Sequence, residues 1–160
     1  MKRIEGSQDV ALIECVNPVR GKWRIRWDVQ EQENGNVNYM EEEFNHKPSD
    51  EEIRETIVQW INDETDSKIL SGFSYQGSLV WLSSENQFNY KAAYDLAIQT
   101  DGQSLPVTFK FGSEQEPCYY EFTTIAQIND FYTQAISHIQ STLEKGWSDK
   151  DNINIEAYHV

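Results

Sequence analysis

Cysteine, long apolar runs and positive charge are all scarce in this chain of 160 residues. Its two cysteines, Cys15 and Cys118, fall in different predicted strands, so we expect both to stay reduced and to pack as small apolar side chains. No apolar segment reaches the length of about 18 residues that a membrane-spanning helix requires. The first 30 residues contain no apolar run of signal-peptide length. We therefore expect neither secretion by that route nor membrane insertion.

Positive charge is scarce because 27 acidic residues outnumber 13 Lys and Arg, which gives a net charge of -14. Residues 1–47 hold 7 cationic and 9 acidic side chains, whereas residues 48–160 hold 6 and 18. Nucleic-acid backbones require clustered cations, so we expect no nucleic-acid binding. Negative charge of this size favours solubility at high concentration, or a partner with a basic face.

Reactive side chains are few and scattered along the chain. His46, His138 and His159 show no metal-binding spacing, and the sequence contains neither a glycine-rich phosphate loop nor a nucleophile elbow. The acidic run Glu41–Glu43 fits no calcium loop, and we interpret it as exposed charge at the end of a strand. We therefore expect no enzymatic activity, no cofactor and no metal.

The clearest strand pattern is Lys22–Val29, where apolar and charged side chains alternate strictly. Trp23, Ile25 and Trp27 share one face with Val29. Most tryptophans of the chain should be core, but an uncovered face of this kind would form an interaction surface, because large aromatic patches seldom stay exposed. With an apolar run at 10–16 and a return strand after the Asn34-Gly35 turn, residues 10–45 predict a three-stranded meander.

The rest of the chain predicts helices and hairpins in a regular order. A helix begins at Ser49, where Glu52 three residues later completes a capping box, and its apolar stripe includes Ile53, Ile57 and Ile61. Residues 72–100 and 105–144 then each predict two strands followed by a helix.

We predict an α+β fold: one antiparallel sheet built from the meander and two hairpins, with about three helices on one face. The expected segments are a meander at 1–47, an α+β domain at 48–146 and a loose tail at 147–160. Gly72 should close the first helix with a positive φ, and Gly146 should end the last one.

The helix after the first hairpin opens with a polar cluster that includes Glu85, Asn86 and Asn89. These amides and acids could bind a peptide or a sugar; alternatively, Asn86 and its neighbours satisfy the free N–H groups at the helix start. Either Ser83 or Ser84 provides the cap.

The apolar residues of this helix fall in two adjacent rows. Phe88, Ala92 and Leu96 form one row, with Ala93 and Ala97 beside it. We predict that both rows are buried and that this helix is the central one of the fold.

Several of these motifs together resemble an uncharacterised family of small phage and prophage proteins. The resemblance lies in Ile69-Leu70-Ser71-Gly72-Phe73, Tyr75-x-Gly77, Val80-Trp81-Leu82-Ser83, Gln87-x-Asn89, Leu105–Phe111, the hairpin at Pro117 and the helix Thr124–Leu143. In that family the corresponding domain occurs in tail-associated or tail-fibre-assembly-like proteins, and the family has no established catalytic residues. The meander lies outside the resemblance.

The resemblance implies a non-enzymatic, virion-associated or tail-assembly protein that binds phage structural or assembly proteins. It implies synthesis in the bacterial cytoplasm, with or without retention in the virion, and it leaves self-association into a homo-oligomer open. The aromatic face of the meander or its unpaired edge strand would provide the contact. Two alternatives remain: an acidic inhibitor that mimics nucleic acid, and a carbohydrate- or peptide-binding module or hydrolase with a cleft near Glu85, Asn86 and Asn89.

Overall fold

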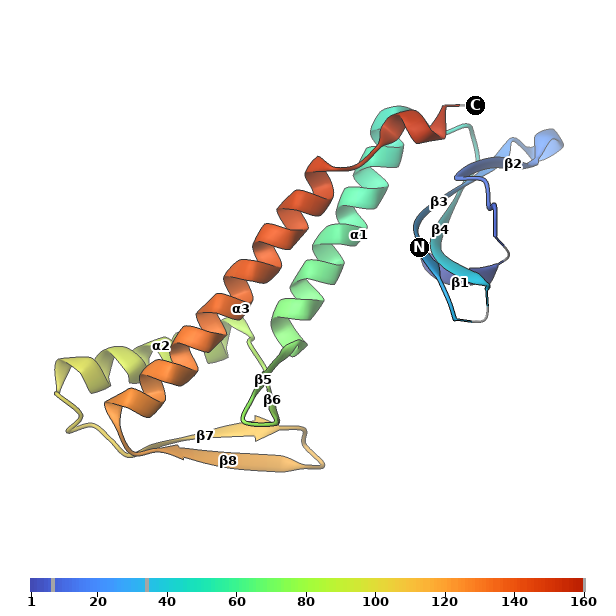
Figure 1. The fold of residues 1–160 in the computed structure, drawn as a ribbon. Coiled ribbons are helices and arrows are strands. Elements are labelled where there is room, and N and C mark those ends of the chain that lie inside the picture. Colours follow the sequence, from blue (N-terminus) through green and yellow to red (C-terminus); the bar gives the residue numbers. More distant parts are fainter. Residues whose placement is uncertain (7, 34, 160) are drawn as a thin grey trace. The chain divides into compact units, whose positions relative to one another are not determined.

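The computed structural model describes residues 1–6, 8–33 and 35–159, and it confirms the expected α+β class with three α-helices (Figure 1). The strands are β1 (Lys2–Gly6), β2 (Ile13–Asn17), β3 (Lys22–Glu31), β4 (Val37–Phe44), β5 (Phe73–Tyr75), β6 (Ser78–Val80), β7 (Val107–Gly112) and β8 (Pro117–Phe122). The helices are η1 (Pro18–Arg20), α1 (Asp50–Ser71), α2 (Ser84–Gln99), α3 (Ile125–Asp151) and η2 (Ile155–Tyr158).

The chain forms two compact units, which we treat separately. Unit 1 comprises Met1–Asn62 and Asp149–Val160, and unit 2 comprises Asp63–Ser148. Both α1 and α3 contribute residues to each unit. The boundaries of the units therefore fall inside these helices and differ from those of the expected segments 1–47, 48–146 and 147–160. In the described residues the strands form three antiparallel sheets rather than the single sheet expected, because in unit 2 β5 pairs with β6 and β7 with β8 as separate two-stranded sheets.

The sheet of unit 1 contains the predicted meander and one additional strand. Its order is β1-β4-β3-β2, with every neighbouring pair antiparallel. Strand β1 was not predicted; it is a short charged strand that pairs along β4 from Lys2↔Glu41 to Gly6↔Val37. In the predicted Asn-Gly turn, Gly35 has the expected positive φ of 79°, while Asn34 lies outside the described residues.

Helix α1 begins as predicted, with reciprocal hydrogen bonds between Ser49 and Glu52. The Ser49 backbone N–H donates to the Glu52 carboxylate at 2.8 Å, and the Glu52 N–H donates to the Ser49 hydroxyl at 3.3 Å. These bonds satisfy the free N–H groups of the first turn and hold the pKa of Glu52 below its ordinary value. Ile53, Ile57 and Ile61 are buried in the core of unit 1, as their spacing predicts.

The C-terminal segment is ordered, which corrects two expectations. Helix α3 continues through Gly146 to Asp151, and η2 follows in place of a loose tail. Tyr158 is buried in the core of unit 1, where its hydroxyl donates a 2.8 Å hydrogen bond to the backbone oxygen of Arg26. Burial raises the pKa of Tyr158 to about 12, so the hydroxyl remains a donor at neutral pH. Burial and hydrogen bonding of Tyr158 therefore hold the C-terminal segment against the rest of unit 1.

We expect Tyr158→Phe to lower the free energy of unfolding by about 1 kcal/mol, because it removes a buried hydrogen bond and keeps the ring. Urea unfolding followed by circular dichroism measures the change. Tyr119→Phe is the matched control, since that hydroxyl belongs to an exposed residue, and it should leave stability unchanged. Equal stability of the Tyr158 variant and the parent would show that the hydroxyl does not anchor the segment.

Helix α1 ends at Ser71, inside unit 2, and at the next residue, Gly72, the expected reason for glycine is wrong. Gly72 does not have a positive φ; instead, a Cβ on it would lie 2.3 Å from the backbone oxygen of Lys68. The hairpin β5–β6 follows, and its turn residues Gln76 and Gly77 have φ of 50° and 81°. Positive φ at both central positions is the geometry of the type I′ turn, one of the two common turns of two-residue hairpins.

The second ββα segment of unit 2 forms as predicted. Strands β7 and β8 pair from Val107↔Phe122 to Gly112↔Pro117, with Phe111 and Phe122 fully buried. The cap of α3 is reciprocal: the Thr124 N–H donates to the Gln127 side chain at 3.2 Å, and the Gln127 N–H donates to the Thr124 hydroxyl at 3.3 Å. The observed order β5-β6-α2-β7-β8-α3 is the repeated ββα order that the sequence predicts.

Gly146 has a packing role in place of the expected helix-ending role. It is buried in α3 against Thr65 of α1, and both residues belong to unit 2. A Cβ on Gly146 would lie 2.5 Å from Thr65 Oγ1 and 3.3 Å from Thr65 Cγ2. A glycine inside a helix normally costs about 1 kcal/mol relative to alanine, so close packing must outweigh helix propensity here.

We therefore expect Gly146→Ala to lower the free energy of unfolding by about 1–3 kcal/mol, although alanine is the better helix former. Thr65→Ala in the same chain removes both crowding atoms and should restore most of the loss. Thermal and urea unfolding of the two single variants and the double variant give the coupling between the sites. A Gly146→Ala protein more stable than its parent would contradict this assignment.

Candidate functional site

The aromatic face of β3, an expected interaction surface, is largely buried in the core of unit 1. Ile25 is fully buried and Trp27 is buried, with the Trp27 ring edge-on to Trp60 at 6.2 Å between centroids. Trp23 is partly buried, and the Lys47 ammonium group lies 5.3 Å from the centroid of its ring. The expectation of an interaction surface is therefore not met at Ile25 and Trp27, because helix α1 and the C-terminal segment supply their apolar neighbours.

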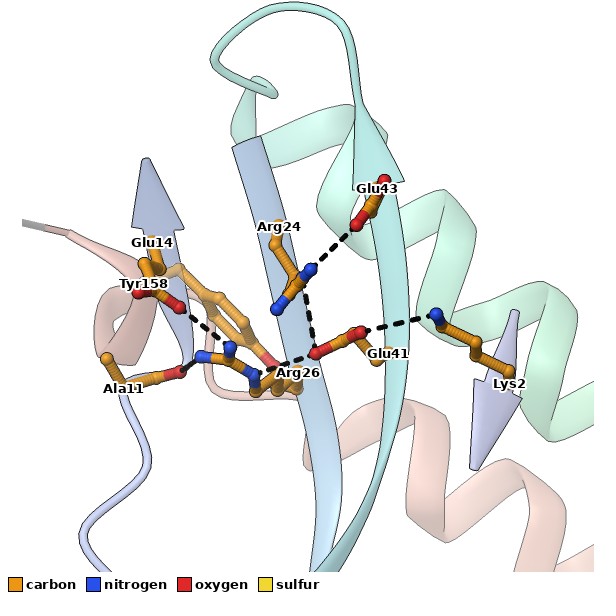
Figure 2. Close-up of polar contacts among 8 residues, drawn as sticks. All are labelled: Lys2, Ala11, Glu14, Arg24, Arg26, Glu41, Glu43 and Tyr158. Carbon is orange, nitrogen blue, oxygen red and sulfur yellow. Dashed lines mark hydrogen bonds and ion pairs between the residues drawn. The ribbon is translucent and has the colours of Figure 1, made fainter. Parts of the chain in front are cut away.

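The other face of the same sheet carries a network of charged side chains, shown in Figure 2. Arg26 lies at its centre and donates from Nε to Glu41 at 3.1 Å, from Nη2 to Glu14 at 2.7 Å and from Nη1 to the backbone oxygen of Ala11 at 2.8 Å. Burial alone would lower the pKa of Arg26, but the hydrogen bonds to Glu14 and Glu41 raise it above its ordinary value. Arg26 therefore stays charged inside the network.

Glu41 corrects the interpretation of residues 41–43 as exposed charge. Its side chain is only 3% exposed and lies near three cations: Arg26, Arg24 at 3.3 Å and Lys2 at 3.9 Å. Figure 2 shows these side chains converging on the Glu41 carboxylate from neighbouring strands. The carboxylate is thus neutralised by the protein itself, and a buried charge is tolerated only when it is paired in this way.

The network also matches the pairing of the strands. Arg24 lies opposite Glu43, Arg26 opposite Glu41, and Lys2 opposite Glu41. A slip of one residue would turn each of these charges toward the apolar face, so the network specifies the register. This site was not predicted from the sequence, although alternating arginines on one strand, Arg24 and Arg26, and the acidic run Glu41–Glu43 on the next were the available signal.

We expect Arg26→Met to lower the free energy of unfolding by about 3 kcal/mol, because the buried carboxylate of Glu41 loses its closest partner. The double variant Arg26→Met/Glu41→Met should recover most of that loss, since it removes the stranded charge as well. Urea unfolding measures both, with Arg20→Met as a control at an exposed arginine. Equal losses in the single and double variants would argue against a stranded charge.

In unit 2, the polar cluster at the start of α2 serves mainly as a helix cap. Ser83 is the capping residue, since its hydroxyl accepts from the Asn86 N–H at 3.2 Å. The Asn86 side chain donates to the backbone oxygen of Trp81 at 2.9 Å, and the Gln87 side chain donates to that of Leu82 at 2.7 Å. Asn86 and Gln87 thus hold the end of the first hairpin against the helix.

Glu85 and Asn89 belong instead to an exposed face of α2 that also carries apolar side chains. We call Glu85, Phe88, Asn89, Ala92 and Leu96 the α2 outer face; all five are exposed, Phe88 to 72% and Leu96 to 50%. These positions follow the i, i+3, i+4 spacing that places side chains on one side of a helix. The expectation that this row is buried is therefore wrong.

The buried row of α2 is centred on Tyr90 and Ala97. The Tyr90 ring lies 4.7 Å from Phe109 and 5.1 Å from Phe131 between centroids. With only two residues buried, α2 is not the central helix that the sequence predicts. The row with Tyr90 and Ala97 packs against the aromatic core, and the row with Phe88 and Leu96 is exposed to solvent.

Two hollows, of about 530 and 500 Å³, lie within unit 2. One is lined by Asp66, Ile69, Leu70, Leu82, Ser83, Ser84, Gln87 and Ile139. The other is lined by Trp81 and the run Lys110, Phe111, Gly112, Ser113, Glu114 and Gln115. Neither is lined by Glu85, Asn86 or Asn89, so these two hollows do not supply the cleft considered for those residues.

The histidine side chains contact a carboxylate or a backbone oxygen. His46 and His159 contact the carboxylates of Glu52 and Asp50 at 2.8 and 3.0 Å, and His138 contacts the backbone oxygen of Lys68 at 3.0 Å. Among residues 1–6, 8–33 and 35–159, no group of three His, Cys, Asp or Glu side chains is placed to hold a metal ion. No helix in the same ranges has the length and apolar character needed to cross a membrane.

The fold and these surfaces define a small α+β protein with an exposed apolar helix face and an aromatic hollow. Residues 52–159 match the family described as "Domain of unknown function (DUF4376)", and the chain belongs to that family. The matched region begins in the first turn of α1 and includes η2, and it leaves β1–β4 outside. No curated protein and no solved structure matches the chain significantly.

Proposed function

We propose that this chain is a non-enzymatic phage or prophage protein, associated with the tail or with tail assembly, that acts by contact with another protein. The observation that carries the proposal is the α2 outer face, where Phe88 and Leu96 are exposed in one row. Large apolar side chains that share an exposed face typically mark a site of protein contact. The resemblance of residues 53–143 to tail-associated phage proteins supplies the biological setting.

The α2 outer face has the form of a helix that binds in a groove. Phe88, Ala92 and Leu96 are four residues apart, which is the spacing of anchor residues on a helix that a partner groove receives. Phe88 is the largest of them, and an aromatic side chain offers about 150–250 Å² to a partner. Glu85 lies beside this row and adds negative charge at its N-terminal end. The fitting partner is a tail protein with an apolar groove and a basic rim.

The meander retains one of its two expected routes of contact, the edge strands. Its aromatic face is largely buried, but β1 and β2 are the edge strands of the four-stranded sheet. Edge strands present unpaired backbone groups to a partner strand. Because β1 carries Lys2, Arg3 and Glu5, its charged side chains oppose unselective pairing. We therefore assign the contact to α2.

We expect the double variant Phe88→Ser/Leu96→Ser to lower binding to tail proteins of the same phage by at least about tenfold, because it removes both large apolar anchors. Pull-down of tail proteins from purified particles, followed by titration of the captured protein, measures the loss. Both sites are exposed, so unfolding should shift by no more than about 0.5 kcal/mol per site. Gln99→Ser, at an exposed polar position of α2, is the matched control.

Three outcomes would overturn the proposal. Capture of no tail protein by the parent chain is the first, and equal capture by the parent and the double variant is the second. The third is capture that disappears at about 0.5 M salt and is insensitive to the double variant, which would identify the acidic-inhibitor alternative. Solution mass of parent and variant shows whether the same face mediates self-association.

A further inference from the structure

Trp81 is held in a fixed position at the edge of the second hollow of unit 2. It follows β6 and lies between Val80 and Leu82, which are both buried, so its own side chain points to the opposite side. The indole N–H donates to the backbone oxygen of Gly112 at 3.2 Å, which fixes the ring against the β7–β8 hairpin. The residue nevertheless remains 41% exposed. The Trp81 ring is thus exposed to solvent, and its hydrogen bond restricts rotation of the side chain.

The loop between β7 and β8, which lines the hollow with Trp81, has a conformation defined by backbone contacts. Gly112 has a φ of 81°, and a Cβ there would lie 2.2 Å from the backbone oxygen of Glu116, so only glycine fits. The Ser113 hydroxyl accepts a 3.0 Å hydrogen bond from the Glu116 N–H and closes the turn. Strand pairing continues up to Gly112↔Pro117. The hollow therefore has a preformed wall, which lowers the entropic cost of binding a ligand.

The polar side chains around the hollow offer both kinds of hydrogen-bonding group. Lys110 is a donor, Glu114 is an acceptor, and Ser113 and Gln115 each provide both. The charges of Lys110 and Glu114 cancel, so the lining as a whole is neutral. Its volume of about 500 Å³ lies in the usual range for small-molecule sites, about 300–1,000 Å³. An aromatic surface with a few polar groups in the same lining is typical of such sites.

We propose that this hollow binds a neutral oligosaccharide, with one sugar ring stacked on the Trp81 indole and its hydroxyls bonded to Glu114, Gln115 and Lys110. A sugar ring has an apolar C–H face and a rim of hydroxyls that are donors and acceptors at once, which matches an indole bordered by amide, carboxylate and ammonium groups. Phosphorylated or sulfated ligands fit less well, because Glu114 and the net charge of -14 repel them. An apolar peptide would leave the polar rim unpaired.

The site does not depend on the function proposed above. Trp81 and residues 110–115 lie outside the α2 outer face, and the experiments use different variants and different probes. Loss of tail-protein binding in the Phe88→Ser/Leu96→Ser variant should leave oligosaccharide binding intact. Failure of one proposal is therefore distinguishable from failure of the other.

NMR of the whole chain, labelled with ¹⁵N, tests the site through its indole N–H signals. The signal of Trp81 is assigned by its absence from Trp81→Phe. The probes are neutral di- to tetrasaccharides of glucose, galactose, mannose and N-acetylglucosamine, each titrated to about 20 mM to reach weak affinities. We expect at least one series to shift the Trp81 signal with saturation. The other four indole signals should stay in place.

Trp81→Ala should then weaken that binding at least about tenfold, and Gln115→Ala several-fold, whereas Trp81→Phe should retain part of it because a ring remains. Tyr119→Ala is the matched control, since Tyr119 is an exposed aromatic of the same hairpin that does not line the hollow. The spectrum of each variant, recorded before sugar is added, shows whether that variant is folded. The proposal is overturned if no neutral sugar shifts the Trp81 signal, if Tyr119→Ala and Trp81→Ala lose binding equally, or if only anionic sugars or apolar peptides bind.

Discussion

The ring of Phe131, on α3, is the point on which the structure of unit 2 depends. It is fully buried, and its centroid lies between 5.1 and 6.2 Å from those of six other aromatic rings. Those rings belong to Phe73 and Tyr75 of β5, Tyr90 of α2, Phe109 and Phe111 of β7, and Phe122 of β8. Since four elements meet at one side chain, its packing fixes which face each of them turns inward.

Both open surfaces of unit 2 follow from this inward packing. Tyr90 faces Phe131, and Phe88 is two positions away, about 200° around the helix, so burial of the first exposes the second. On the hairpin side, Val80 and Leu82 are buried in the same cluster, and the residue between them must point outward. Trp81 is that residue. Phe88 and Trp81 are thus exposed because the opposite faces of α2 and of the segment after β6 pack into the core.

The parts of the fold that are encoded locally could be predicted from the sequence. Alternation identified β3, β7 and β8, and the capping boxes at Ser49 and Thr124 identified two helix starts, because the interacting groups lie within a few residues of each other. The rest depended on partners distant in the chain. Two neighbouring rows of α2 have suitable spacing for burial, and only Phe131 selects between them; likewise, burial of Gly146 depends on Thr65. The outer-face residues Glu85 and Asn89 were found, but Phe88 beside them was expected in the core.

Glu41 shows how the scarce positive charge is used in unit 1. Residues 1–47 hold 7 of the 13 cationic side chains, and Lys2, Arg24 and Arg26 all lie within 4 Å of the Glu41 carboxylate. Arg3 is likewise paired, with Asp28. These four cations pair with acids of their own sheet, so they do not offset the excess acidity of residues 48–160. The partner proposed for the α2 outer face would therefore meet an acidic protein, and charge would favour a basic rim around a groove that binds Phe88.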